Sequence, residues 1–174
     1  MENLRLYRID DKYIYYLKGS DSRVQNNKNK KRPYVGIVLI VSNYRYFVPM
    51  ESPKPNHTNI KTGSHIMKLD NGKLGLLGFN NMIPVHDSAL IPFDIDDETD
   101  KKYAELLRRQ ISYINRRKAD VLNSASKTYF KATAGNNDFL SKICCDFKKL
   151  ENACGHYNPN FKKSTTKKPS VTKK

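Results

Sequence analysis

The chain has 174 residues, 38% of them hydrophobic, and its 32 lysines and arginines outnumber 17 acidic residues, giving a formal net charge of +15. This length favours a single domain with its own core. No apolar run approaches the roughly 20 residues that span a bilayer. The first five residues form no hydrophobic signal region, so we expect a cytoplasmic protein rather than a secreted one. The charge is the electrostatic footprint of a nucleic-acid-binding protein, with solubility alone or an anionic membrane surface as the alternatives.

The first predicted elements are a strand and a short helix. Residues 4–9 alternate between apolar and polar, which predicts a half-buried strand. Asp10 follows and is a suitable N-cap for a short helix. A polar loop over residues 20–32 then ends in the basic run Lys28-Asn-Lys-Lys-Arg32. This run leads directly into the next predicted strand.

Two β-hairpins are predicted in the middle of the chain. Their turns are Ser42-Asn43 and Asp70-Asn-Gly72, both of which are typical hairpin sequences. A proline-rich loop over about residues 50–65 separates the two hairpins. The hairpin strands are expected at residues 34–41, 44–48, 66–69 and 74–77, with a further short strand at 82–85.

The second half of the chain is predicted to be helical. An acidic linker over residues 94–100 ends in residues that are typical of a helix N-terminus. Three helices are expected, running from there to about residue 122, over 124–132, and over 138–153. Strands in the first half and helices in the second give an α+β fold: a twisted antiparallel sheet or open barrel surrounded by helices. We expect one domain over residues 1–157 and a lysine-rich, disordered tail over 158–174.

Three cysteines lie in the C-terminal region, at positions 144, 145 and 154. The number is odd, the first two are adjacent, and no second pair completes a zinc-binding spacing. We therefore expect reduced thiols in a cytosolic protein, with no metal and no cofactor.

The loop between the hairpins carries the strongest candidates for chemistry. Ser52, Lys54 and His57 place a hydroxyl, an ammonium and an imidazole within six residues, and the prolines on either side of Lys54 restrict the backbone. These groups can assist RNA cleavage by its own 2′-OH without a metal. Lys54 can stabilise charge on the phosphate or protonate the leaving oxygen, Ser52 can orient the phosphate, and His57 can act as acid or base. The alternative is that Ser-Pro-Lys-Pro is an ordinary surface turn.

Several residues are candidates for holding RNA. Tyr46 lies beside the candidate loop and could stack on an unpaired base. The basic face of the long predicted helix, with Arg108, Arg109 and Arg116, could bind RNA or simply be solvated. A basic loop just before the first hairpin could grip the phosphate backbone through Lys28, Lys30, Lys31 and Arg32.

The candidate loop and the strands around it resemble the endoribonucleases of type III toxin–antitoxin systems, the ToxN/AbiQ group. The resemblance spans about residues 4–130 and weakens beyond them. The segments that carry it are Tyr34-Val-Gly-Ile-Val-Leu39, Tyr46-Phe-Val-Pro49, Ser52-Pro-Lys54 with His57, Leu74-Gly-Leu-Leu77, Asn81-Met-Ile-Pro84 and Gln110-Ile-Ser-Tyr-Ile114.

The resemblance implies a fold like that of the MazF and Kid toxins. It also implies a metal-independent endoribonuclease that cuts single-stranded, A-rich messages and leaves 2′,3′-cyclic phosphate and 5′-hydroxyl ends. The inhibitor would be an RNA made of tandem repeats, which the toxin processes into pseudoknots and binds in a closed protein–RNA assembly. The biological role would be abortive infection, in which phage attack releases the toxin.

Carried onto this chain, the resemblance assigns the catalytic positions to Ser52 and Lys54 and the motif histidine to His57. Arg32 falls where a basic residue reaches the active site. Glu51 stands where the ToxN motif would have threonine. An acid beside a phosphate site could serve as a base or weaken RNA binding.

Two other functions remain open at the level of sequence. One is a non-enzymatic RNA-binding module that uses the same basic surface. The other keeps the toxin fold but acts on a different target, as some Kid/CcdB-like proteins do.

Overall fold

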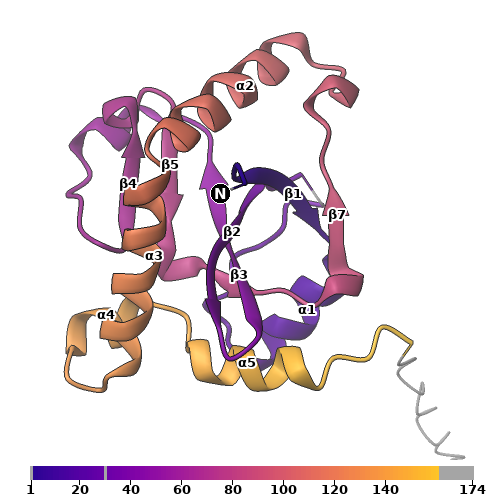
Figure 1. Ribbon diagram of the computed structural model, residues 1–174, viewed down its shortest axis with the longest axis vertical. Coiled ribbons are helices and arrows are strands. Elements are labelled where there is room, and N and C mark those ends of the chain that lie inside the picture. Colours follow the sequence, from indigo (N-terminus) through magenta and orange to yellow (C-terminus); the bar gives the residue numbers. More distant parts are fainter. Residues whose placement is uncertain (1, 30, 161–174) are drawn as a thin grey trace, which may run out of the picture.

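The computed structural model describes residues 2–29 and 31–160 and shows an open antiparallel sheet with helices packed around it (Figure 1). The strand order is β4-β5-β3-β2-β1-β7, and β6 pairs separately with β3. The predicted α+β class is confirmed, and the sheet does not close into a barrel. The likeness to MazF and Kid stays a prediction. The strands are β1 (Arg5–Ile9), β2 (Tyr34–Val41), β3 (Tyr44–Glu51), β4 (Ile66–Leu69), β5 (Gly75–Gly78), β6 (Ile83–Pro84) and β7 (Leu90–Pro92).

The hairpin of β2 and β3 forms the centre of this sheet. Ser42 and Asn43 adopt the positive φ values of 47° and 70° that a tight hairpin turn requires. β3 runs to Glu51, three residues beyond the predicted end, because its last residues pair with β5. This extension places the candidate loop at the end of a central strand. β7 was missed by the sequence analysis because it has only three residues and ends in a proline.

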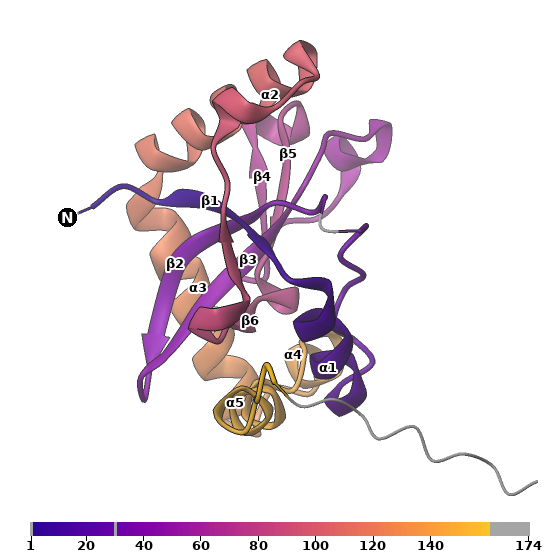
Figure 2. The same ribbon diagram turned by 90° about the vertical axis from the view of Figure 1, so that its right-hand side faces the viewer.

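The helices are α1 (Asp11–Ser20), α2 (Lys101–Arg116), α3 (Lys118–Thr133), α4 (Asp138–Ile143) and α5 (Phe147–Gly155). Figures 1 and 2 show α2 at one end of the sheet and α1 beside α5 at the other. None of the helices in the described part of the chain combines the length and apolarity needed to cross a bilayer. Asp10 and Asp100 cap α1 and α2 as predicted, each accepting hydrogen bonds from backbone N–H groups.

Two helix boundaries differ from the prediction. The helix expected up to residue 122 breaks at Arg117, whose φ and ψ of −110° and 24° are not helical. The apolar stripe continues across the break because Ile114 and Val121 are both fully buried. The helix expected over 138–153 breaks before Asp146, which caps α5. Phe139, near the start of α4, is 59% exposed.

A buried polar cluster joins α3 and α5 to the central strand. Glu151 accepts hydrogen bonds from the hydroxyls of Tyr46, at 2.9 Å, and Tyr129, at 2.6 Å. Lys148 donates to the second carboxylate oxygen at 3.0 Å. The three cysteines are also buried and carry free thiols. The predicted single domain over 1–157 stays a prediction, and the predicted tail lies outside the described residues from position 161 onward.

Candidate active site

The candidate loop begins where β3 leaves the sheet. Its backbone is extended through Lys54 and then forms a short 3-10 turn, Pro55–Asn59. Two glycines with positive φ contact this loop: Gly72 in the turn between β4 and β5, and Gly75 at the start of β5. A Cβ on Gly72 would lie 2.9 Å from the carbonyl carbon of His57, and one on Gly75 would lie 1.9 Å from the carbonyl oxygen of Glu51. Only glycine allows these two chain segments to approach so closely.

The loop places two nitrogen-bearing side chains near the carboxylate of Glu51. Lys54 Nζ donates to Glu51 Oε2 at 2.8 Å, and His57 Nε2 lies 4.0 Å from the same oxygen. Ser52 and Lys54 are exposed, whereas His57 is 1% exposed. The ring atom Nδ1 of His57 has no hydrogen-bond partner among the described residues.

These surroundings set the charges of the loop. Burial lowers the pKa of His57 below its usual value of 6.5; the carboxylate of Glu51 opposes this effect and the charge of Lys54 adds to it. Partial burial would raise the pKa of Glu51, but the hydrogen bond and charge of Lys54, together with the charges of Arg32 and His57, hold it below its usual value. At neutral pH the carboxylate is therefore ionised and the imidazole is neutral.

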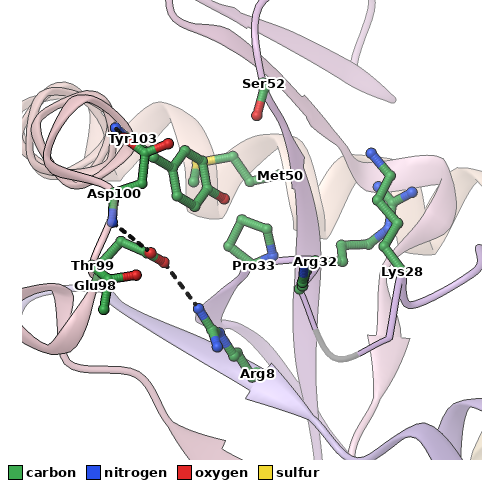
Figure 3. Close-up of a pocket in the computed structure, with 11 residues that line it drawn as sticks. Arg8, Lys28, Arg32, Pro33, Met50, Ser52, Glu98, Thr99, Asp100 and Tyr103 are labelled. Carbon is green, nitrogen blue, oxygen red and sulfur yellow. Dashed lines mark hydrogen bonds and ion pairs between the residues drawn. The ribbon is translucent and has the colours of Figure 1, made fainter.

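Ser52 also lines a pocket of about 490 Å³ (Figure 3). Lys28, Lys31 and Arg32 form one wall of this pocket. The opposite wall is formed by Glu98, Thr99, Asp100 and Tyr103, from the linker and the start of α2. The pocket therefore has a basic side suited to phosphate and an acidic, aromatic side.

Arg32 is the most constrained basic residue in the pocket. It is 8% exposed, and its Nε donates to the carbonyl of Asn26 at 2.8 Å. Its Nη1 is buried and has no partner among the described residues. The loop that carries it is folded back by a hydrogen bond from its own backbone N–H to the carbonyl of Asn27. These contacts hold the guanidinium of Arg32 in place at the basic wall of the pocket.

The structure brings together most of the predicted site residues. Lys54 and His57 lie near Glu51, and Ser52 lines the pocket whose basic wall is formed by Lys28, Lys31 and Arg32. Lys30 lies outside the described residues. Tyr46 was wrongly predicted to face RNA: it is fully buried, and its hydroxyl is hydrogen-bonded to Glu151.

The acidic wall of the pocket was missed by the sequence analysis. Glu98 and Asp100 lie in the linker that was predicted only to lead into a helix, and Tyr103 lies in that predicted helix. No local signal could have placed them, because the wall lies about 50 residues along the chain from Ser52 and meets it only through the fold.

The basic face of α2 lines a second pocket, of about 460 Å³. Arg109 and Arg116 lie there beside Asp70 from the turn between β4 and β5. Arg108 is paired with Asp96 at 2.6 Å, so its charge is partly neutralised. The predicted role of this face in binding RNA stays a prediction. Across residues 2–29 and 31–160, no group of three or more histidine, cysteine, aspartate or glutamate side chains is placed to hold a metal ion.

The chain thus combines an open antiparallel sheet with a loop that exposes a hydroxyl and an ammonium near a basic pocket. Residues 5–155 match the family described as toxin ToxN of type III toxin–antitoxin systems. The chain belongs to this family.

Individual relatives agree with this assignment. Endoribonuclease ToxN of Bacillus thuringiensis subsp. kurstaki is 33% identical over 165 residues, covering 90% of this chain and 85% of the relative. A solved type III toxin, described as inhibited by a non-coding RNA pseudoknot, superposes with a TM-score of 0.79 at 33% identity, covering 88% of this chain and 97% of the toxin. AbiQ, a lactococcal anti-phage endoribonuclease of the same system type, superposes with a TM-score of 0.80 at 30% identity, with the same coverage.

Proposed function

We propose that this chain is the endoribonuclease toxin of a type III toxin–antitoxin system and cleaves single-stranded, A-rich RNA without a metal. The observation that carries the proposal is the pocket that Ser52 lines together with Lys28, Lys31 and Arg32. Ser52 directly follows Glu51, whose carboxylate is paired with Lys54. The charge of Arg32 acts on the same carboxylate. The basic wall and the Glu51–Lys54 pair are therefore neighbours.

The chemistry follows from these positions. The 2′-oxygen of the RNA attacks the adjacent phosphorus, the bond from phosphorus to the 5′-oxygen breaks, and a 2′,3′-cyclic phosphate remains. Lys54 stabilises the charge on the phosphorane and donates a proton to the departing 5′-oxygen. Ser52 orients the phosphate by hydrogen bonding, and the proton of the 2′-OH is lost to solvent.

Glu51 and His57 act through their neighbours. Glu51 holds Lys54 at 2.8 Å and is a weak base because its pKa is lowered, by its hydrogen bond with Lys54 and by nearby positive charge acting against partial burial. His57 is 1% exposed, and its Nε2 lies 4.0 Å from the Glu51 carboxylate. We assign it as a positioning residue for that carboxylate, in place of the direct acid or base role that its sequence position predicted.

The biological setting follows from the relatives. One structural relative is described as inhibited by an RNA pseudoknot and another as an anti-phage protein. We therefore propose that this toxin acts in the cytoplasm during abortive infection. A repeat-derived RNA antitoxin, which the toxin itself processes, would hold it inactive in a closed assembly.

The test is to incubate the purified protein with a long, A-rich single-stranded RNA in excess EDTA, alongside Ser52→Ala. We expect the wild type alone to cleave, leaving cyclic phosphate and 5′-hydroxyl ends. Ser52→Ala should lose about 10²–10³-fold in rate and keep its RNA affinity and melting temperature, because Ser52 is exposed. Tight RNA binding by the wild type without cleavage would instead support a binding module, and the absence of both would favour a different target.

A further inference from the structure

The pocket beside Ser52 has two walls of opposite character, and only the basic wall is needed to hold a phosphate. Figure 3 shows Asp100 and Tyr103 on one side of Pro33, with Arg32 and Lys28 on the other. An acidic wall repels the phosphate backbone of RNA. It must therefore face another part of the nucleotide if RNA occupies the pocket.

The acidic wall is held rigidly by its own hydrogen bonds. Asp100 Oδ1 accepts from the backbone N–H groups of Lys102, at 3.0 Å, and Tyr103, at 3.1 Å. The backbone N–H of Asp100 donates to Glu98 Oε1 at 3.2 Å, and Glu98 Oε2 accepts from Arg8 at 3.3 Å. Asp100 is exposed and lines the pocket, whereas the carboxylate of Glu98 is occupied by Arg8 and by the backbone N–H of Asp100.

An aromatic ring completes this wall. Tyr103 is half-buried and lines the pocket together with Met50 and Pro33, whose side chains form an apolar floor. Figure 3 shows the Tyr103 ring extending from the start of α2 towards Met50. Aromatic rings of this kind are the usual stacking surfaces for unpaired bases, and each such contact is worth a substantial part of the binding energy.

We propose that Tyr103 and Asp100 form a nucleobase subsite that selects an amino-bearing purine next to the scissile phosphate. The proposal rests on the ribonuclease function proposed above and assigns base preference to these two residues. An ionised carboxylate only accepts hydrogen bonds, so it favours a base edge with amino N–H groups and disfavours uracil, whose edge carries carbonyl oxygens. The Tyr103 ring favours a purine because the larger base covers more of it.

The two walls then recognise different parts of the nucleotide. Arg32, which lines the pocket together with Lys28 and Lys31, binds the phosphate whatever the sequence. Asp100 and Tyr103 read the base beside it. Variants of the two walls should consequently differ in kind: loss of a phosphate contact weakens binding to all sequences alike, and loss of a base contact changes the order of preference.

The experiment uses the full chain with Ser52→Ala, so that RNA binds without being cut. Fluorescence anisotropy measures its affinity for labelled oligouridine and for the same oligomer with one central adenosine. We expect the adenosine to raise the affinity by about tenfold. Adding Asp100→Asn should remove most of this gain, although asparagine still caps α2. Tyr103→Leu should also remove it, whereas Tyr103→Phe, which keeps the ring, should retain it.

Two matched variants act as controls. Asp97→Asn removes an exposed acid of the same linker outside the pocket and should leave the adenosine gain intact. Arg32→Ala should weaken both oligomers by a similar factor. A full adenosine gain in both Asp100→Asn and Tyr103→Leu would overturn the proposal.

The experiments test the ribonuclease function and the base subsite separately. If the wild type cuts no RNA in EDTA, the ribonuclease assignment fails, and the anisotropy still tests the subsite on its own. If the wild type cuts RNA but the Asp100 and Tyr103 variants keep its base preference, the subsite alone fails.

Discussion

Two glutamate–lysine pairs in the described part of the chain have the same spacing along the sequence and different surroundings. Glu51 and Lys54 meet at 2.8 Å, and Lys148 and Glu151 meet at 3.0 Å. Glu151 is buried and also accepts hydrogen bonds from two tyrosine hydroxyls. Glu51 is half-buried, and its neighbourhood contains buried nitrogens without partners, on Arg32 and His57.

The contrast separates a structural cluster from a functional one. Around Glu151 each donor meets an acceptor, so the cluster fixes the packing of α3 and α5 on β3. Around Glu51, Nη1 of Arg32 and Nδ1 of His57 are buried without a partner among the described residues, so the hydrogen bonding of this cluster is incomplete.

Removing each lysine in turn tests most directly whether only the Glu51–Lys54 pair takes part in cleavage. Lys54→Ala should lower kcat for RNA cleavage by about 10²–10³-fold, because the phosphorane and the leaving oxygen lose their cation. Lys148→Ala is the matched control and should leave kcat unchanged. Steady-state cleavage of a labelled oligomer measures both. Normal turnover by Lys54→Ala would remove this residue from the mechanism.

The second prediction concerns the buried cluster. Glu151→Ala should lower the free energy of unfolding by about 3 kcal/mol, because two buried tyrosine hydroxyls lose their acceptor. Urea denaturation measures the change, and the cleavage rate per folded molecule should stay the same. A stable Glu151→Ala protein would show that this cluster does not hold the helices.

The third prediction tests the role of Glu51. Glu51→Gln should lower kcat by about two- to fivefold, because an exposed ion pair that positions Lys54 is lost. KM for RNA should fall at the same time, since a negative charge beside the phosphate path is removed. Kinetics at two salt concentrations separate the effects. A loss of kcat by several hundredfold would identify Glu51 as the catalytic base instead.

The smallest expected effect is the contribution of His57 to the pH dependence of the free energy of unfolding. Burial lowers its pKa in the folded protein below 6.5, so the unfolded chain takes up a proton first as the pH falls. Stability from this group is present above pH 6.5 and is lost as the pH falls through the folded pKa. Comparing the free energy of unfolding at pH 7.5 and 5.5, we expect a smaller loss in His57→Asn than in the wild type. An unchanged pH dependence would contradict the assigned state of His57. Some of the dependence should remain in the variant, because burial also lowers the pKa of His65.

Much of the fold follows from local sequence. The turns at Ser42-Asn43 and Asp70-Gly72 and the caps at Asp10 and Asp100 were predicted correctly, because turn and cap chemistry depends on a few adjacent residues. The break at Arg117 was not predicted, because an apolar stripe with helical spacing continues across it.

The candidate site, like the fold, was predicted from the sequence only in part. Ser52, Lys54 and His57 are close in the chain, so the sequence by itself determined that a hydroxyl, an ammonium and an imidazole share one loop. Only the tertiary structure decided that Tyr46 is buried against Glu151 and that His57 lies behind Glu51. Burial depends on which elements pack over a residue, and neighbouring residues along the chain do not report this.

The pocket itself exists only in the folded protein. Arg8 on β1, Arg32 before β2, Ser52 after β3 and Tyr103 on α2 meet because the sheet order places β1, β2 and β3 side by side and α2 returns to their end. The sequence determined the charge and the reactive groups that a phosphate needs. The fold decided which wall faces the phosphate and which faces the base, because contacts between residues far apart in the chain are set by strand order and helix packing.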